Sequence, residues 1–335
     1  MRPPLTVPPK IRPGDRVAVL SPSFAAPGAF PAVHELAMRR LRDELQLEPV
    51  EYPTTRQLGA PARDRARDLM AAFADPGIAA VLAAHPKAFC GYSDNTNLLN
   101  YRWNLGLAGY YGGSTMVHLG GRAGGPHPVS VASLRAALFS EADLPLFPAE
   151  RFGEDEADWD RPETLAQEGP SSPGGGWTWH QPGQVVTGPT WGGDLEIVQW
   201  NLAAGRWIRP AEDYAGCVLL LETDEERPSP QAVFRMLRNM GERGLLAQFP
   251  AVLFGRAKAA VFGVPAEASE RTRYRAEQRE AVLRAFADYS PGAMVVFDVD
   301  FGHTDPQWVL PYGGAVTVDG PARTITAHYA AGPAG

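Results

Sequence analysis

One serine of the chain stands where a strand and a helix are expected to meet. Ser93 lies in "PKAFCGYSDNTNLL" (86–99), after an apolar run and directly before a helical pattern. A sharp turn there would raise its hydroxyl above the sheet edge, beside backbone N–H groups that can stabilise the oxyanion formed when a carbonyl is attacked. Gly91 would remove side-chain bulk from this turn. Serine is also a common helix cap, so the position alone fits either a nucleophile or a cap.

A serine nucleophile needs a base and a carboxylate that orients the base. Among the seven histidines, His303 follows a strong strand pattern in "VVFDVDFGHTDP" (295–306), where an abrupt turn exposes it. Glu222 ends the apolar run "CVLLLE" (217–222), a placement that would hold its carboxylate rigidly at the sheet edge. A surface-turn histidine and a structural salt bridge are the alternatives.

The turn around His303 also offers an alternative metal cluster of Asp298, Asp300, His303 and Asp305. Asp298 and Asp300 would share one face of a strand, while the turn redirects the other two side chains. We therefore expect no metal. No G-x-G-x-x-G follows the first predicted strand, where "SPSFAAPG" stands, so we expect no dinucleotide cofactor either.

The elements that position these residues alternate between strand and helix. Strand patterns cover 15–23, 77–84 and 87–92, and helical patterns cover 31–45, 61–74 and the stretch from Ser93. This order predicts an α/β fold with a doubly wound parallel sheet, in which ligands bind beyond the carboxyl ends of the strands. We expect an N-terminal α/β domain over 1–140, a linker or active-site loop over 141–183, and a C-terminal β/α domain over 184–335 carrying Glu222 and His303.

Composition limits the class of partner. The 335 residues include 31 basic and 38 acidic side chains, a net charge of -7 that gives no reason to expect a nucleic-acid polymer. Apolar runs are strand-sized, so we expect no membrane association. The prolines near the N-terminus do not fit a signal peptide, and Cys90 and Cys217 both lie in apolar runs, typical of buried thiols. We expect a cytoplasmic protein.

Five blocks of sequence occur in the order seen in the LD-carboxypeptidase and microcin C immunity protein family, which the chain resembles over roughly residues 9–330. They are "PPKIRPGDRVAVLSPS", "PKAFCGYSDNTNLL", "GPTWGGDLEIV", "CVLLLETDEE" and "FDVDFGHTDPQWVLPYGGAVTVD". The resemblance implies a flavodoxin-like domain joined to a smaller swivelling β/α domain, a homodimer, and a catalytic triad in the inter-domain cleft. Its motifs match Ser93, Glu222 and His303, with the Asp94 backbone N–H in the oxyanion hole.

One departure concerns the second oxyanion donor. The family usually carries a Gly-Gly loop between the strands expected at 77–84 and 87–92, whereas here "VLAA" runs directly into "HPKAF". Losing one such donor typically lowers turnover by about 10²–10³-fold. Gly112 and Gly113 in "YYGGST" are candidates to replace it. Without a replacement, the chain would be a catalytically impaired binding homologue.

The resemblance leaves two substrate classes open. LD-carboxypeptidases remove a terminal D-alanine from muropeptide tetrapeptides, and microcin C immunity proteins cleave the bond between an aminoacyl group and a modified nucleotide. The latter carry a longer segment before the C-terminal domain, with a tryptophan that stacks on the base. Trp177 and Trp179 end such a segment here, although they would serve equally to fix it to the domain. We expect an immunity-like substrate bound by Trp177, Trp179 and Gly193, with a small peptide as the alternative.

Overall fold

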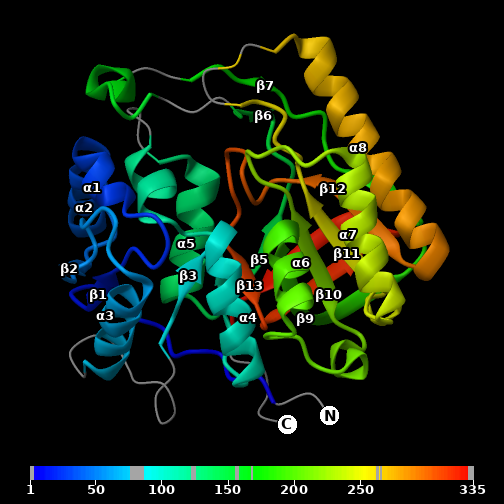
Figure 1. Ribbon diagram of the computed structural model, residues 1–335, viewed down its shortest axis with the longest axis horizontal. Helices are drawn as coiled ribbons and strands as arrows, with labels where there is room; N and C mark the ends of the chain where they lie inside the picture. The colour runs from blue at the N-terminus through cyan, green and yellow to red at the C-terminus, as the bar shows by residue number, and fades with distance from the viewer. Residues whose placement is uncertain are drawn as a thin grey trace.

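The computed structural model describes residues 4–75, 87–121, 126–154, 158–166, 169–261, 264 and 266–330. The largest sheet of the described residues lies in the C-terminal half, and a smaller one joins strands from both halves (Figure 1). The strand expected at 77–84 lies outside the described residues. In the described part, no helix is both long and apolar enough to span a membrane.

The N-terminal half alternates strands and helices as predicted. Its elements are β1 (Arg16–Val19), α1 (Ala26–Ala29), α2 (Pro31–Asp43), β2 (Glu48–Glu51), α3 (Ala62–Ala74), β3 (Cys90–Gly91), the 3-10 turn η1 (Ser93–Asn95), α4 (Thr96–Asn104), β4 (Gly109–Tyr111), the π-helix η2 (Thr115–Gly120) and α5 (Pro128–Phe139). β1 pairs in parallel with β2, and β3 pairs in parallel with β4. The helices predicted at 31–45 and 61–74 are α2 and α3.

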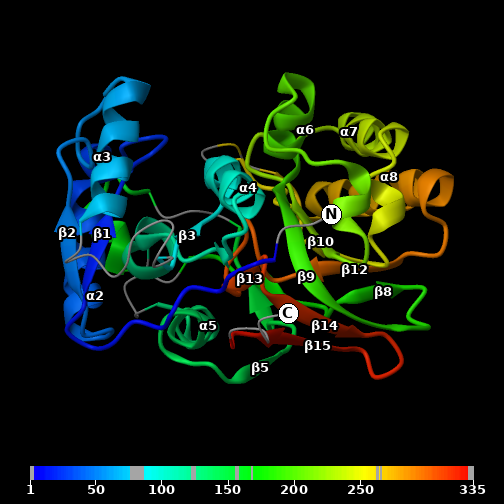
Figure 2. The same ribbon diagram turned by 90° about the horizontal axis from the view of Figure 1, so that it is seen from below.

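The C-terminal half carries the largest sheet among the described residues. Its elements are β9 (Val185–Asp194), α6 (Leu195–Ala204), the 3-10 turn η4 (Ala211–Tyr214), β10 (Val218–Glu222), α7 (Pro230–Glu242), the 3-10 turn η5 (Leu246–Gln248), β11 (Ala251–Gly255), α8 (Ala268–Tyr289), β12 (Met294–Val299), β13 (Leu310–Tyr312), β14 (Ala315–Asp319) and β15 (Thr324–His328). The sheet runs β5-β15-β14-β9-β10-β11-β12-β8, where β5 is Asp143–Leu146 and β8 is Thr178–His180. Helices α6, α7 and α8 lie on one side of it (Figure 2).

The segment 141–183 contains strands, which its lack of periodicity did not predict. They are β5 (Asp143–Leu146), β6 (Arg151–Phe152), β7 (Ser172–Pro173) and β8 (Thr178–His180), with the 3-10 turn η3 (Pro162–Ala166) between β6 and β7. β5 and β8 form the two outer strands of the eight-stranded sheet, while β6 and β7 pair with each other. The first and last strands of this segment, β5 and β8, therefore belong to the sheet of the C-terminal half.

Two features of this architecture bring distant residues together. β9, β10, β11 and β12 are parallel, so their carboxyl ends share one edge of the sheet. β13, which follows the His303 turn, pairs with β4, and β4 pairs with β3. β3, which precedes Ser93, is thereby joined through β4 to β13, which follows His303 in the sequence. The α/β class predicted from the sequence is confirmed.

Candidate active site

Ser93 lies in a strained turn between β3 and α4. Its φ of +56° falls in the left-handed region, which is uncommon for a residue other than glycine and is typical of strand-to-helix turns that expose a nucleophile. Gly91 fits as predicted, because a Cβ added there would lie 2.7 Å from Cβ of Asn95. The serine caps no helix through its side chain. The structure therefore favours the exposed-hydroxyl interpretation over the cap.

Glu222 and His303 form a close pair at the carboxyl edge of the large sheet. Glu222 is the last residue of β10, and its Oε2 lies 2.7 Å from Nδ1 of His303. The side chain of His303 is 6% exposed and that of Glu222 is 1% exposed. A buried carboxylate that holds one ring nitrogen fixes both the tautomer and the orientation of the imidazole.

Tyr111, the last residue of β4, connects this pair to the serine turn. Its buried hydroxyl donates to Oε1 of Glu222 at 2.5 Å and accepts from the backbone N–H of Ser93 at 3.4 Å. The ring of Tyr92 lies 4.9 Å from the ring of His303, measured between centroids. The structure thus brings Ser93, Glu222 and His303, which are far apart in sequence, to one site.

The second ring nitrogen of His303 faces a different carboxylate. Nε2 lies 3.4 Å from Oε2 of Glu225, which belongs to the turn after β10. Within the described part of the chain, the Ser93 hydroxyl makes no hydrogen bond to His303. Catalytic hydrogen bonds are often long before substrate binds, so this geometry corresponds to a resting arrangement of the three groups.

The charge of the site keeps His303 protonated. Burial alone would lower the pKa of its imidazole, but the charge and hydrogen bond of Glu222, with smaller contributions from Glu225 and Asp194, raise that pKa to about 9. At neutral pH the ring therefore carries a proton. As a general base it becomes fully available only as the pH approaches this value.

Asp194 is a residue of this site that the sequence did not single out. It ends β9 beside the end of β10, and it caps α6 because its Oδ1 accepts from the backbone N–H groups of Glu196 and Ile197 at 2.9 and 3.0 Å. Burial and the nearby charge of Glu222 raise the pKa of Asp194 to about 8. The Gly-Gly-Asp before a helix in "GPTWGGDLEIV" signals the cap, but nothing in that pattern signals the approach to Glu222.

Gly193, predicted to bind substrate, lies at a point of close packing in the same edge. Its φ is +111°, and an added Cβ would lie 2.6 Å from Oγ1 of Thr96 and 3.0 Å from a ring carbon of Tyr111. Thr96 Oγ1 also accepts from the backbone N–H of Asp194 at 3.1 Å. The glycine thus lets the end of β9 approach α4, next to the Ser93 turn.

The two tryptophans predicted to bind substrate fix their segment to the sheet. Trp177 donates its indole N–H to Oδ2 of Asp300 at 2.9 Å, and Trp179 belongs to β8, where it pairs with Val296 of β12. Both also pack against the main hydrophobic core. These contacts match the anchoring role that the sequence left open. A role in stacking on a base stays a prediction.

The alternative metal cluster is not assembled. Both strand aspartates form ion pairs with arginines: Arg256 lies 3.1 Å from Asp300, and Arg279 lies 2.5 Å from Asp298. His303 turns to Glu222 instead, away from this pair of aspartates. A different set of three groups lies close together, since ligand atoms of Asp194, Glu222 and His303 all lie within 4.8 Å of one another.

The predicted oxyanion donors have different surroundings. Asp94 is in the first turn after Ser93, where backbone N–H groups have no intrahelical acceptor, and its side chain accepts from the Ser23 hydroxyl. The N–H of Gly112 donates to the Gly91 carbonyl at 2.9 Å, and that of Gly113 donates to His118 Nε2 at 3.4 Å. Gly112 is therefore not available as a replacement donor, and Gly113 is already engaged. The position of the missing Gly-Gly loop, around residue 84, lies outside the described residues.

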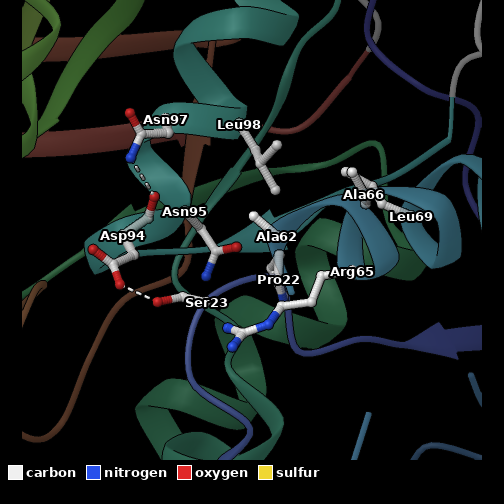
Figure 3. A pocket seen from close by; sticks show the side chains of 10 residues that line it. All are labelled: Pro22, Ser23, Ala62, Arg65, Ala66, Leu69, Asp94, Asn95, Asn97 and Leu98. Atoms are coloured by element: carbon white, nitrogen blue, oxygen red, sulfur yellow. Dashed lines mark hydrogen bonds between the residues drawn. The ribbon is translucent and has the colours of Figure 1, made fainter. Parts of the chain in front are cut away.

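A pocket of about 350 Å³ adjoins Asp94 (Figure 3). It is lined by the segment after β1, by one face of α3 and by the start of α4, and the Arg65 side chain extends into it from α3. Asn95 and Asn97 contribute amide groups on the α4 side. This pocket next to the serine turn offers the Arg65 cation, the Asp94 carboxylate and several neutral polar groups to a ligand.

Comparison with known proteins agrees with this geometry. Models of the LD-carboxypeptidase N-terminal and C-terminal domains match residues 17–85 and 187–318. The chain belongs to the LD-carboxypeptidase family. It is accordingly a hydrolase of the serine-peptidase type. Comparison with proteins of curated function found no match.

Solved structures share this family member's fold over nearly its whole length. An MccF-like protein from Streptococcus pneumoniae, in complex with AMP, is 22% identical, with a TM-score of 0.81 over 94% of this chain and 99% of the other. An MccF-like protein from Bacillus anthracis is 20% identical, with a TM-score of 0.79 over 96% and 98%. MccF in complex with glutamyl sulfamoyl guanosine is 18% identical, with a TM-score of 0.80 over 97% and 98%. The two-domain architecture expected from the resemblance is confirmed.

Proposed function

We propose that this protein hydrolyses the bond between an aminoacyl group and a nucleotide-like leaving group, through an acyl-enzyme on Ser93. The observation that carries the proposal is the buried Glu222–His303 pair, held 2.7 Å apart at the sheet edge where the strained Ser93 turn also lies. A carboxylate, an imidazole and a serine converging in this way are the elements of a proton-transfer unit.

The proposed first step forms the acyl-enzyme. In its neutral form, which becomes more populated as the pH approaches 9, His303 accepts the proton of the Ser93 hydroxyl at Nε2 as Oγ attacks the acyl carbonyl carbon. Glu222 stabilises the resulting imidazolium through Nδ1. The Asp94 backbone N–H donates to the oxyanion of the tetrahedral intermediate. When this intermediate collapses, Nε2 returns its proton to the leaving nitrogen, and the acyl–nitrogen bond breaks.

The second step releases the acyl group. A water molecule gives a proton to His303 Nε2 as its oxygen attacks the ester carbon, and the collapse of the second intermediate returns that proton to Ser93 Oγ. Nε2 must leave Glu225 before either step, because the 3.4 Å contact occupies the nitrogen that accepts the serine proton. Rotation of the exposed Glu225 side chain achieves this without moving the buried Glu222–His303 pair.

Ligands of the similar structures support the choice of leaving group. MccF structures have been solved with glutamyl sulfamoyl guanosine and with aspartyl sulfamoyl adenosine, and the Streptococcus pneumoniae protein binds AMP. The extended segment over 141–183, with Trp177 near its end, fits the same branch of the family. Removal of a terminal D-alanine from a muropeptide tetrapeptide is the second candidate, since the matching family models are those of LD-carboxypeptidases.

Product analysis separates these candidates. Purified protein is incubated with aspartyl sulfamoyl adenosine and, separately, with muropeptide tetrapeptide, and products are identified by mass spectrometry. We expect free aspartate and sulfamoyl adenosine from the first substrate, and no turnover by Ser93→Ala. Release of D-alanine alone would favour the second candidate. Tight binding without any product would identify a non-catalytic homologue, and full activity of Ser93→Ala would contradict the mechanism.

A further inference from the structure

Carboxyl groups crowd the catalytic imidazole. They come from the end of β9, from the first turn of α6, and from the end of β10 with the turn that follows it. We call these residues the acidic rim: Asp194, Glu196, Glu222, Asp224 and Glu225. Because β9 and β10 are parallel neighbours, both strands deliver their last carboxylate to the same edge, with Glu222 paired to Asp194 in the register.

Two oxygens of the acidic rim are buried without a hydrogen-bond partner among the described residues, Oδ2 of Asp194 and Oε2 of Glu196. The Asp194 residue is 1% exposed, and its Oδ1 is used by two backbone N–H groups at the start of α6. Its Oδ2 has no hydrogen-bond partner among the described residues. A buried carboxylate oxygen left unpaired costs about 1–3 kcal/mol, so Oδ2 gains either a proton, which the raised pKa of about 8 favours, or a donor from a ligand.

The unpaired group faces the reaction site. A carboxylate oxygen of Asp194 lies within 4.8 Å of ligand atoms of both Glu222 and His303. Oε1 of Glu222 accepts from the Tyr111 hydroxyl, and Oε2 contacts Nδ1 of His303. Neither Tyr111 nor Nδ1 of His303 therefore supplies a donor to Asp194. A cation bound beside the imidazole would supply such a donor and would displace the proton from Asp194.

Charge in the acidic rim is poorly balanced. Burial, with the neighbouring Asp224, raises the pKa of Glu196 to about 7, and burial with Glu222 raises that of Asp194 to about 8. Among the described residues, the basic group in contact with the acidic rim is His303. Arg227, which follows Glu226, lies over the Tyr274 ring at 4.9 Å. The surplus of carboxyl groups favours a cationic ligand.

From this geometry we infer that the acidic rim binds a protonated amine on the acyl part of the substrate, with Asp194 Oδ2 as an acceptor of its N–H donors. The inference rests on the proposed function and adds the class of acyl group. An ammonium group carries three donors and no acceptor, and its charge would favour the ionised form of Asp194, whose oxygens then act as acceptors. Its charge would also compete with the imidazolium for Glu225, which would release Nε2 of His303 toward Ser93.

A pair of phosphonylating reagents tests the inference without knowledge of the natural substrate. One fluorophosphonate carries a 4-aminobutyl group, and the other carries an n-pentyl group of nearly the same shape. At pH 7 the amine is protonated. The rate of covalent modification is followed by intact-protein mass spectrometry, and the modified residue is identified by peptide mapping. We expect Ser93 to react about tenfold faster, or more, with the aminobutyl reagent.

Variants of the acidic rim give the matched controls. Asp194→Asn keeps the oxygen that caps α6 but removes the charge, and Glu225→Gln changes an exposed side chain. In both variants, the modification rates with the aminobutyl and pentyl reagents should differ by less than about threefold. Asp288→Asn, on the exposed side of α8, removes one negative charge at a distance and should leave the ratio unchanged. Circular dichroism and the melting temperature establish that each variant is folded.

The possible outcomes separate the two levels of the proposal. Equal rates with the two reagents on Ser93, or a ratio that neither rim variant changes, would contradict the amine subsite while leaving the hydrolase intact. Failure of both reagents to modify Ser93 would contradict the proposed function and the subsite together. Equal rates with the two reagents, together with rates that change on addition of Mg²⁺ or Zn²⁺ and return with EDTA, would show that the acidic rim binds a metal ion instead.

Discussion

Replacement of Glu222 by glutamine should lower the pKa of His303 sharply. In the native protein Glu222 contributes both the largest favourable charge interaction and a hydrogen bond to the imidazolium, while burial opposes protonation. Glutamine keeps nearly the same shape and can still contact Nδ1 and the Tyr111 hydroxyl. The substitution therefore removes the charge of the partner with little change in packing.

The size of the expected fall in the pKa follows from how strongly Glu222 favours the protonated over the neutral form of His303. The pKa of His303 is about 9, against an ordinary value of 6.5, and burial alone would place it below 6.5. Since Glu225 and Asp194 still favour the charged form, we expect a fall of about 2 units in Glu222→Gln. One unit corresponds to about 1.4 kcal/mol, so the pair is worth about 3 kcal/mol to the protonated form.

The same shift predicts how stability depends on pH. Because the pKa of His303 is higher in the folded than in the unfolded state, its contribution to the free energy of unfolding is fully present below pH 6.5. This contribution is lost as the pH rises through about 9. The stability difference between the native protein and Glu222→Gln should therefore shrink between pH 6 and pH 9.5 in urea titrations.

Histidine NMR measures the shift directly. The imidazole resonances of both proteins are followed from pH 5 to pH 10, and His303→Gln assigns the signal among the seven histidines. We expect a midpoint near 9 in the native protein and near 7 or below in Glu222→Gln. Midpoints that agree within half a unit would refute the argument that Glu222 holds the proton on His303.

Three further outcomes follow from the site. The ratio kcat/KM should rise with pH between 7 and 9 as His303 loses its proton, and a flat profile would contradict its role as the base. Tyr111→Phe should lower the free energy of unfolding by about 1–3 kcal/mol in urea, because the triad carboxylate loses a buried donor. Gly193→Ala should lower it by at least about 1 kcal/mol, since its Cβ would lie 2.6 Å from Thr96 Oγ1 at a positive φ.

Matched substitutions give the controls for the two stability changes. Tyr101→Phe removes a hydroxyl from a side chain that is 39% exposed, so it should change the free energy of unfolding little. Gly205→Ala also places a Cβ at a positive φ, but nothing lies within 4 Å of that position. A loss at Gly193 no larger than that at Gly205 would show that close packing on α4 is not required.

Much of the fold could be predicted from the sequence, because the relevant signals are local. Hydrophobic periodicity predicted α2 and α3, and apolar runs predicted β10 and β12. The three triad candidates could be chosen because each follows a predicted strand at a turn, and the ends of parallel strands meet at a common edge. A resemblance to one family then supported the same three positions.

Long-range pairing explains what the sequence did not show. β13 is only three residues long, and its pairing with β4 carries Tyr111 to Glu222 although no pattern near residue 111 indicates it. The raised pKa of Asp194 likewise depends on the neighbouring strand and on burial, not on its own segment. Within 141–183, β5 and β8 are short edge strands whose partners lie far away in sequence, and β6 and β7 are two residues long, so no periodicity develops in this segment.

The covalent intermediate on Ser93 gives the most direct test of the mechanism. Native protein is mixed with aspartyl sulfamoyl adenosine, quenched in acid within the first turnover, and digested for peptide mapping. The mechanism requires an aspartyl ester on the peptide containing Ser93, absent from Ser93→Ala and accumulating more slowly in His303→Gln. Product formation with no adduct at any time, or an adduct on another residue, would contradict it.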